Sequence, residues 1–240
     1  MNTVKSLRGI SDNLEGFFVD KQQELPLFPL SNTVLFPGMA LPLHIFEERY
    51  KLMISECIRD SRPFGVVLIR SGHEVGPGAT IHTVGTTAHI SQVENLNDGR
   101  MNIAALGHNR FRVKSVHSKK PYLTGLVDFF PLLDQDNEQA KLLAPKIASM
   151  LQGYLDIFAT LGKVELEMEA LPDDPVTLAF LTAIILRTPA KDKQLLLDVP
   201  DLLSLLRVER KMLNRETHIL KILVENGPRW RDDPRPFSTN

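Results

Sequence analysis

The residue types that most often carry chemistry are sparse and poorly spaced in this sequence. Cys57 is the single cysteine, so neither an internal disulfide nor a Cys-x-x-Cys site can form. His73-Glu74 lacks the second histidine of a zinc-protease motif. His82 and His89 are seven residues apart in a β-rich segment, an odd separation that directs them to opposite faces of a strand. We therefore predict no metal site and no cofactor.

Nucleophiles and paired carboxylates are also poorly placed for catalysis. Cys57 falls on the apolar stripe of a predicted helix, where a free thiol behaves as a small hydrophobic group. Glu47-Glu48 opens that helix and Asp173-Asp174 precedes another, so capping and helix-dipole interactions account for both acidic pairs. Gly162-Lys163 is followed by Val164, which breaks the Gly-x-x-x-x-Gly-Lys-Ser/Thr phosphate-binding motif. The Gly72–Gly78 stretch has no helix after it, so a β-turn connection is favoured over a phosphate-binding loop.

The composition is that of an ordinary globular protein. The 240 residues are 43% hydrophobic and 24% charged, with a net charge of −1, and the length fits one large domain or two modest ones. Up to Leu132 there are 14 basic and 12 acidic residues, which is too even for a typical nucleic-acid-binding domain. No apolar run approaches the roughly 20 residues of a membrane span. The first twenty residues lack the apolar core of a secretion signal. Together with the single cysteine, these features predict a cytoplasmic protein.

The hydrophobic period changes near Leu133. Before that residue the pattern predicts short strands separated by turns. Tight-turn residues at Asn97-Asp98-Gly99 predict a hairpin. The prolines Pro26 and Pro29 favour an edge strand or an extended arm for the first strand. One helix interrupts, with Tyr50, Met53, Ile54 and Cys57 on one face. The predicted strands are Glu24–Leu30, Phe64–Ile69, Thr80–Val93, Met101–Leu106, Phe111–Val116 and Tyr122–Phe129, and the helix is Glu47–Arg59.

After Leu133 the period becomes that of α-helices. We predict a helix capped by Asp136 that runs to Leu161, kinks at Pro145 and stops at Gly162. Three further helices are predicted, from Asp174-Pro175 to Arg187, from Thr188-Pro189 to Leu197, and from Asp198 with Pro200 to Glu225, closed by Gly227-Pro228. The predicted organisation is a mobile leader over 1–23, a β-domain over 24–133, a helical subdomain over 134–226 and a flexible Pro-rich tail over 227–240.

Two glutamates fall inside the apolar stripe of the last predicted helix. At 100° per residue, Glu209 and Glu216 lie among its leucines. A buried ionised carboxylate needs a basic or donor partner, and Arg187, at the end of an apolar helix, is our candidate for one of them. The alternative is that the edge of the stripe is open and both carboxylates are hydrated.

Several blocks resemble the N-terminal substrate-recognition domain of Lon proteases. The longest comprises Leu25–Leu30, Val34–Gly38 and Leu41–Tyr50. Further blocks follow in the family's order at Gly65–Ile69, Val84–Thr86, Gly107 with Arg110–Val113, Tyr122–Val127, Lys193–Leu197 and Leu206–Leu213. The resemblance extends over Glu24–Glu225. It implies an α+β fold, in which a PUA-like twisted β-domain of about six strands plus one helix precedes an α-helical bundle. It does not bring the ATPase or the Ser–Lys peptidase, so we expect a stand-alone, non-enzymatic protein.

The resemblance implies a non-catalytic protein-binding module. We expect it to bind unfolded or degron-bearing polypeptides, as an adaptor or competitor beside protease or ATPase components. The segment from Phe36 to Tyr50 has the features of a polypeptide-binding surface. Its methionine adapts to varied side chains, and its prolines and glycine leave backbone groups available for pairing with an added strand. The candidate contacts are Phe36, Met39, His44, Phe46, Glu47, Glu48 and Arg49. Of this segment we expect Leu41 and Phe46 to pack in the β-domain, and Met39, Glu48 and Arg49 to be exposed.

The sequence is also compatible with two other functions. PUA-like folds also bind RNA, and Arg110, Arg112 and Lys114 share one face of a predicted strand beside Lys119 and Lys120. A merely solvated face is the alternative, because aromatic residues are too few for a base-stacking platform. The remaining function is that of a small-molecule or enzyme site in a pocket with no recognisable motif.

Overall fold

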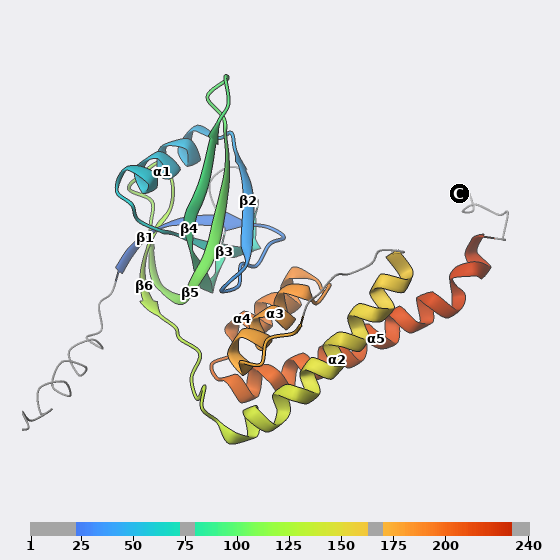
Figure 1. The fold of residues 1–240 in the computed structure, drawn as a ribbon. Helices are drawn as coiled ribbons and strands as arrows, with labels where there is room; N and C mark the ends of the chain where they lie inside the picture. Colours follow the sequence, from blue (N-terminus) through green and yellow to red (C-terminus); the bar gives the residue numbers. More distant parts are fainter. Residues whose placement is uncertain (1–22, 73–79, 163–169, 232–240) are drawn as a thin grey trace, which may run out of the picture.

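The computed structural model describes residues 23–72, 80–162 and 170–231, which form a six-stranded sheet and five helices (Figure 1). The predicted α+β class is therefore confirmed. Most of the predicted leader, most of the Gly-rich stretch after Gly72 and the tail beyond Arg231 lie outside the described residues.

The strands form a closed barrel with one additional edge strand. They are β1 (Gln23–Leu30), β2 (Ala40–Ile45), β3 (Phe64–Ser71), β4 (Thr80–Asn95), β5 (Met101–His117) and β6 (Thr124–Phe129). Their order is β2-β5-β4-β3-β1-β6, and β5 also pairs with β6, which closes the barrel. The two strands predicted on either side of Gly107 are one long strand, β5. The turn at Asn97-Asp98-Gly99 connects β4 to β5 as predicted, with Gly99 at a φ of 78°.

The prediction that β1 is an edge strand or arm is wrong. β1 lies between β3 and β6. Its first half pairs with β6 up to Pro26, and its second half pairs with β3 over Leu27–Leu30. Pro26 is in the half that pairs with β6, and Pro29 is in the half that pairs with β3. Each half has one unpaired side, where the missing N–H of a proline is tolerated.

The strand β2 was not predicted, because a proline such as Pro42 is unfavourable in a strand. β2 pairs antiparallel with the first residues of β5, from Ala40 opposite Leu106 to Ile45 opposite Met101. In the part of the chain that the structure describes, β2 has no partner along its other side. Pro42 is compatible with this position because an edge strand has one side that makes no ladder hydrogen bonds.

Several predicted helix starts shift by one to three residues. The helices are α1 (Glu48–Arg59), α2 (Glu138–Gly162), α3 (Pro175–Ile185), α4 (Ala190–Asp198) and α5 (Leu202–Arg231). Asp174 caps α3 as predicted, accepting from the Thr177 amide at 2.8 Å. Asn137 caps α2 in place of Asp136, and Asp201 caps α5 in place of Asp198. A capping oxygen must reach the second or third amide of the helix, and the predicted residues lie too far back.

The N-cap of α4 and the C-terminal end of α5 also differ from the prediction. Pro189 itself occupies the N-cap of α4, without a side-chain cap. α5 continues through Gly227-Pro228 to Arg231. The helix continues although a glycine costs a helix interior about 1 kcal/mol and a proline about 3 kcal/mol.

The β-domain and the helices α2–α5 share one of the protein's hydrophobic clusters, while two further clusters lie within the β-domain. α1 covers one side of the barrel, and α3 and α4 lie against another end of it (Figure 1). Val34, Phe36, Leu68 and Val84 of the β-domain pack in the same buried cluster as α2–α5. α2 and α5 lie side by side and extend away from the barrel (Figure 1). The predicted boundary near Leu133 therefore marks a change in secondary structure, while the packing is continuous across it.

Candidate functional site

The loop between β1 and β2 is held against β5 by a tight turn. Gly38 donates its amide to the carbonyl of Gly107 at 2.9 Å, and the Gly107 amide donates to Met39 at 2.9 Å. Gly38 has a φ of +79°, a conformation that favours glycine. At position 107 a Cβ would lie 2.2 Å from the Phe36 carbonyl oxygen, so only glycine allows the two segments to approach. This turn gives the Pro37-Gly38 backbone a fixed position beside α3.

An apolar groove lies between this turn and α3. It has a volume of about 370 Å³. Pro37 and Gly38 line it on the β side, and Val176, Thr177, Phe180, Leu181 and Ile184 line it on the helix side. We call this set the arm–α3 groove. A groove bounded by apolar side chains and an irregular backbone segment suits an extended, hydrophobic chain.

α3 presents apolar residues on both its buried and its open faces. Leu178, Ala179 and Ala183 are buried in the helical core, whereas the residues that line the groove are partly or fully exposed. No charged residue occurs between Pro175 and Leu186, so the open face has no group that would require hydration. The apolar helix α3 is thus only half enclosed.

Lys193 fixes the end of α3. Its Nζ donates to the carbonyl oxygens of Ala183 at 2.6 Å and Ile184 at 2.7 Å, which are among the helix-terminal carbonyls that lack partners within the helix. The ammonium also lies 5.8 Å from the centre of the Phe36 ring. Burial lowers the pKa of Lys193 to about 8, because the charged form loses its hydration.

The candidate contacts at the start of the predicted binding segment are mostly covered. Phe36 is 1% exposed and belongs to the core shared by the two parts, so the prediction that it contacts a ligand is wrong. Its ring is large and apolar, and it is more stable in that core than at the surface. Met39 is half-buried and packs against two hydrophobic clusters. The residues that the structure brings to the groove from this segment are instead Pro37 and Gly38.

The other candidates lie at the far end of β2. Phe46 is 56% exposed, contrary to the expectation that it packs in the β-domain, and its ring stacks near His44 with centroids 6.1 Å apart. Glu48 is exposed, while Arg49 is half-buried and pairs with Glu47 at 2.9 Å. At about 3.3 Å per strand residue, this end is roughly 20 Å from the groove. The predicted segment therefore does not form one continuous surface.

The predicted basic strip is interrupted by the helical part. Arg110 and Arg112 do share a face, because both guanidinium groups lie over the ring of Phe130, at 4.7 and 4.1 Å. Arg110, however, is only 3% exposed. Lys114 pairs with Asp128 at 2.8 Å and Lys120 with Glu56 at 2.6 Å. Of the five predicted residues, only Arg112 and Lys119 are exposed without a close ion pair in the described residues, which is too little for a phosphate-binding face.

Arg110 instead joins the β-domain to α4. Its Nη1 donates to the carbonyl oxygens of Leu197 at 2.8 Å and Val199 at 2.6 Å. Burial lowers the pKa of Arg110 to about 10, so the side chain stays charged near neutral pH. Burial likewise raises the pKa of Asp198, to which Gln194 donates at 2.7 Å. Gln194 also donates to the Val84 carbonyl, so α4 is attached to β4 as well as to β5.

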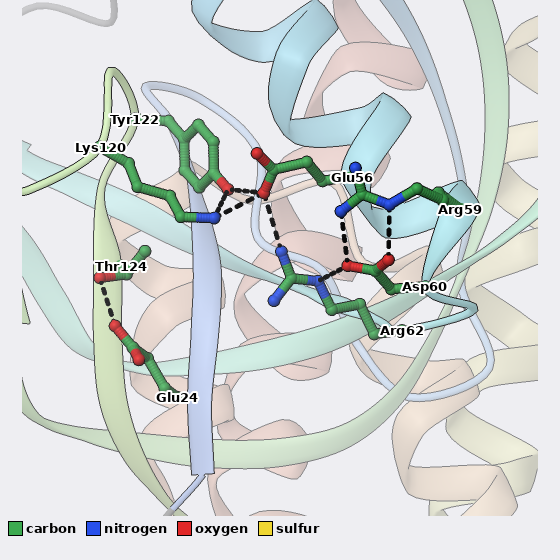
Figure 2. Close-up of polar contacts among 8 residues, drawn as sticks. All are labelled: Glu24, Glu56, Arg59, Asp60, Arg62, Lys120, Tyr122 and Thr124. Carbon is green, nitrogen blue, oxygen red and sulfur yellow. Dashed lines mark hydrogen bonds and ion pairs between the residues drawn. The ribbon is translucent and has the colours of Figure 1, made fainter.

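A polar cluster attaches the end of α1 to the segment between β5 and β6 (Figure 2). Glu56 Oε2 accepts from Lys120 Nζ at 2.6 Å, from the Tyr122 hydroxyl at 2.5 Å and from Arg62 Nη2 at 3.1 Å. The hydrogen bonds from Lys120 and Tyr122 lower the pKa of Glu56, while burial raises the pKa of Tyr122. Every group in the cluster has a partner on another element, which is typical of a structural contact and leaves no group free for catalysis.

Of the two glutamates predicted in the stripe of α5, one is buried and one is at its edge. Glu209 is fully buried, and neither carboxylate oxygen has a hydrogen-bond partner in the described residues. Burial raises its pKa well above the ordinary value. Glu216 is half-buried and pairs with Arg215 at 2.8 Å. The predicted partner Arg187 is exposed and lies over the Phe158 ring, because α3 ends with its last residues facing α2.

Reactive groups are few among the described residues. Burial raises the pKa of the Cys57 thiol to about 11, as its predicted place on the apolar face of α1 implies. The described part of the chain contains no group of three His, Cys, Asp or Glu side chains placed to bind a metal. None of its helices has the length and apolarity to span a bilayer.

The contribution of α3 to the groove was not predicted from the sequence. The signal that could have found it is the eleven-residue helix without a charge, since a helix in a small bundle usually turns a polar face to water. Pairing this helix with the β1–β2 loop requires tertiary structure, because the two segments are about 140 residues apart in the sequence.

Comparison with known proteins agrees with this fold. A family model, described as the ATP-dependent protease La (LON) substrate-binding domain, matches residues 24–215. Lon protease 2 of Myxococcus xanthus is 30% identical over 205 residues, which are 85% of this chain and 25% of that protein. Lon protease of Escherichia coli is 24% identical over 200 residues, 83% of this chain and 26% of that protein. The chain thus spans about a quarter of the length of the curated relatives that it matches.

Two solved structures resemble the model. The Lon N-terminal domain protein from Xanthomonas campestris has a TM-score of 0.58 and 26% identity, covering 77% of this chain and 95% of that one. The N-terminal domain of Mycobacterium avium complex Lon protease has a TM-score of 0.60 over 80% of this chain and 98% of that one, and at 17% identity it supports the fold alone. The resemblance seen in the sequence is confirmed: the chain belongs to the family of ATP-dependent protease La (LON) substrate-binding domains.

Proposed function

We propose that this chain is a non-catalytic module that binds unfolded or degron-bearing polypeptides in the arm–α3 groove. The observation that carries the proposal is the open apolar face of α3, which lies beside the exposed backbone of Pro37 and Gly38. Membership of a substrate-binding family supports the same function. The module acts as an adaptor or competitor that holds a polypeptide beside protease or ATPase components.

The free side of β2 extends the proposed site. β2 begins at Ala40, two residues after Gly38, and is paired on one side only in the described residues. A bound chain whose side chains enter the groove is therefore in position to hydrogen-bond to the backbone of β2 as an added strand. Backbone pairing does not depend on side-chain identity, so it suits a protein that must accept many sequences. The apolar groove then selects for hydrophobic residues.

The affinity is expected to be in the micromolar range, because a flexible chain must become ordered when it binds. Thr177 is exposed at the rim of the groove, so Thr177→Arg places a long cation over the apolar lining and leaves the core unchanged. We expect this variant to bind a fluorescein-labelled, unfolded casein-derived peptide about tenfold more weakly or worse. Fluorescence anisotropy titration measures the effect.

Two controls accompany this titration. Thr160→Arg makes the same substitution at an exposed position on α2 and is expected to bind like the wild type. Phe46→Ser removes the exposed ring at the far end of β2 and tests whether that end contributes. If Thr177→Arg binds as tightly as Thr160→Arg, the groove is the wrong surface. If the wild type binds neither this peptide nor a more hydrophobic one, the peptide-binding function itself is wrong.

A further inference from the structure

A pair of hollows lies along the line where α2 and α5 meet. The first has a volume of about 500 Å³ and is lined by Gln139, Leu142, Leu143, Leu203, Arg207, Arg210 and Lys211. The second has a volume of about 300 Å³ and is lined by Met150, Gly153, Ile157, Asn214, Thr217, His218 and Lys221. We call the combined set the α2–α5 groove, and it shares no residue with the arm–α3 groove.

The two hollows belong to one continuous face. On α2 the lining residues recur at intervals of three, four or seven, which places them on one side of the helix, and the same holds on α5 from Leu203 to Lys221. The early part of α2 lies beside the early part of α5 in the first hollow, so the helices run parallel. From Gln139 to Ile157 the helix axis advances by about 27 Å at 1.5 Å per residue. The groove therefore has the length of a five-turn helix.

The groove combines an apolar floor with a cationic rim. Leu142 is 81% exposed, and Leu143 and Leu203 are partly covered. Arg207, Lys211 and Lys221 are exposed, and Arg210 is half-buried. The ion pairs of the described helical part involve Lys141 and Arg215 instead. Within the part of the chain that the structure describes, Arg207 donates to the neutral Gln139 at 3.2 Å and forms no ion pair.

No acidic residue lines the α2–α5 groove. The positive charge of its rim is therefore not neutralised by the described residues of this chain, although the chain as a whole has a net charge of −1. Exposed leucine and unpaired cations in one concave strip are the complement of a ligand that carries apolar and acidic groups together.

We propose that the α2–α5 groove binds an amphipathic helix of a partner protein, with leucine-type residues on one face and Asp or Glu along its flanks. Two parallel helices with a hollow between them accept a third helix, whose apolar residues enter the groove. The flanking carboxylates then lie opposite Arg207, Arg210 and Lys211. This site is separate from the one in the proposed function, and its ligand is helical and acidic where that of the arm–α3 groove is extended and hydrophobic.

Neither a membrane nor RNA fits this surface as well. A membrane-binding face is convex and commonly carries Trp or Phe, whereas this surface is hollow and its lining contains no Phe, Tyr or Trp. The same lack of aromatic side chains removes the platform on which unpaired bases stack. An acidic amphipathic helix satisfies both the leucines and the cations.

The probe is a fluorescein-labelled synthetic helix of about 18 residues, the length of the groove, with leucine on one face and glutamate on its flanks. We expect it to bind in the micromolar range and to lose affinity as salt increases. Arg207→Glu/Lys211→Glu is expected to weaken binding by at least tenfold. Leu142→Gln, at a position with little contact to the core, is expected to weaken it by about threefold or more, which separates the apolar contribution from the charge.

Two control variants decide the interpretation. Lys119→Glu/Lys191→Glu makes the same change in net charge at exposed positions on the β-domain and α4, and it is expected to bind like the wild type. Thr177→Arg, which blocks the other groove, is also expected to leave this binding unchanged. The proposal is overturned if both double variants lose affinity equally, if the acidic helix does not bind, or if the same cations bind anionic vesicles while the acidic helix does not bind.

Discussion

Arg110→Ala is expected to lower the free energy of unfolding by about 3 kcal/mol, which corresponds to a fall in melting temperature of about 6–12 °C. The reason is the position of the side chain between the β-domain and α4. Its removal leaves the carbonyl groups of Leu197 and Val199 without their charged donor and opens a cavity next to Phe130. Thermal unfolding followed by circular dichroism measures the change.

Arg112→Ala is the matched control for this variant. Arg112 is two residues further along β5 and lies over the same ring of Phe130, but it is exposed. Its removal is expected to change the free energy of unfolding by about 0.5 kcal/mol or less. Equal effects of the two substitutions would mean that Arg110 does not connect the two parts of the protein.

The second large effect is expected at Glu209. This carboxyl group is buried among apolar residues of α5 and its neighbours, and it has no hydrogen-bond partner in the described residues. α3, which packs on α5, carries no ionisable side chain, and the buried residues of α2 are Ala, Ile, Leu and one Tyr. Desolvation raises its pKa well above the ordinary 4.5, so the folded protein holds the proton more tightly than the unfolded chain.

The pH dependence follows from this difference. The contribution of the protonated form is complete below the ordinary pKa of 4.5 and is lost as the pH rises towards the folded-state value. In this window the free energy of unfolding is expected to fall by about 1.4 kcal/mol per pH unit. Glu209→Met replaces the carboxyl with an apolar group of similar length. It is expected to abolish this dependence and to stabilise the protein near pH 7 by about 2 kcal/mol or more.

The measurement is the difference in unfolding free energy between wild type and Glu209→Met, taken by urea titration from pH 4 to pH 8, which removes the contributions of all other groups. Glu216→Gln, at a residue that is partly exposed and paired with Arg215, is expected to show a difference below about 1 kcal/mol. A difference for Glu209→Met that does not change with pH would show that this carboxyl is hydrated or paired.

Local sequence patterns predicted much of the fold. The stripe of Tyr50, Met53, Ile54 and Cys57 is the buried face of α1, as its spacing indicated. Asp174-Pro175 correctly placed the start of α3. These features depend on residues within one or two turns of each other, where spacing and capping chemistry are sufficient.

Features that depend on distant residues were not predictable in this way. Pro26 and Pro29 argued for an edge, but pairing with β6 in one half of β1 and β3 in the other placed the strand inside the barrel. The sequence predicted that Arg110 is a surface residue. It is buried because it contacts α4, whose Leu197 lies 87 residues later in the chain. The stripe of α5 correctly indicated that Glu209 is a core position, yet the sequence could not show that none of the described residues hydrogen-bonds to its carboxylate.

The candidate site shows the same limit. The segment that begins at Phe36 was predicted to bind peptides because of its apolar residues and irregular backbone. Its residues are far apart in space, however: Phe36 is in the core, and Phe46 lies at the other end of β2. The apolar residues that face the Pro37-Gly38 backbone come from α3. A sequence pattern describes residues that are close along the chain, whereas this groove is formed by two segments that only the tertiary structure brings together.

Hydrogen–deuterium exchange with and without an unfolded hydrophobic peptide tests the central claim most directly, because it locates the bound chain. If the peptide enters the arm–α3 groove and pairs with β2, exchange slows in the segment from Gly38 to Ile45 and in the first turns of α3. The Thr177→Arg variant loses this protection, and Thr160→Arg retains it. Protection confined to other segments, with no change in β2 or α3, would contradict the account.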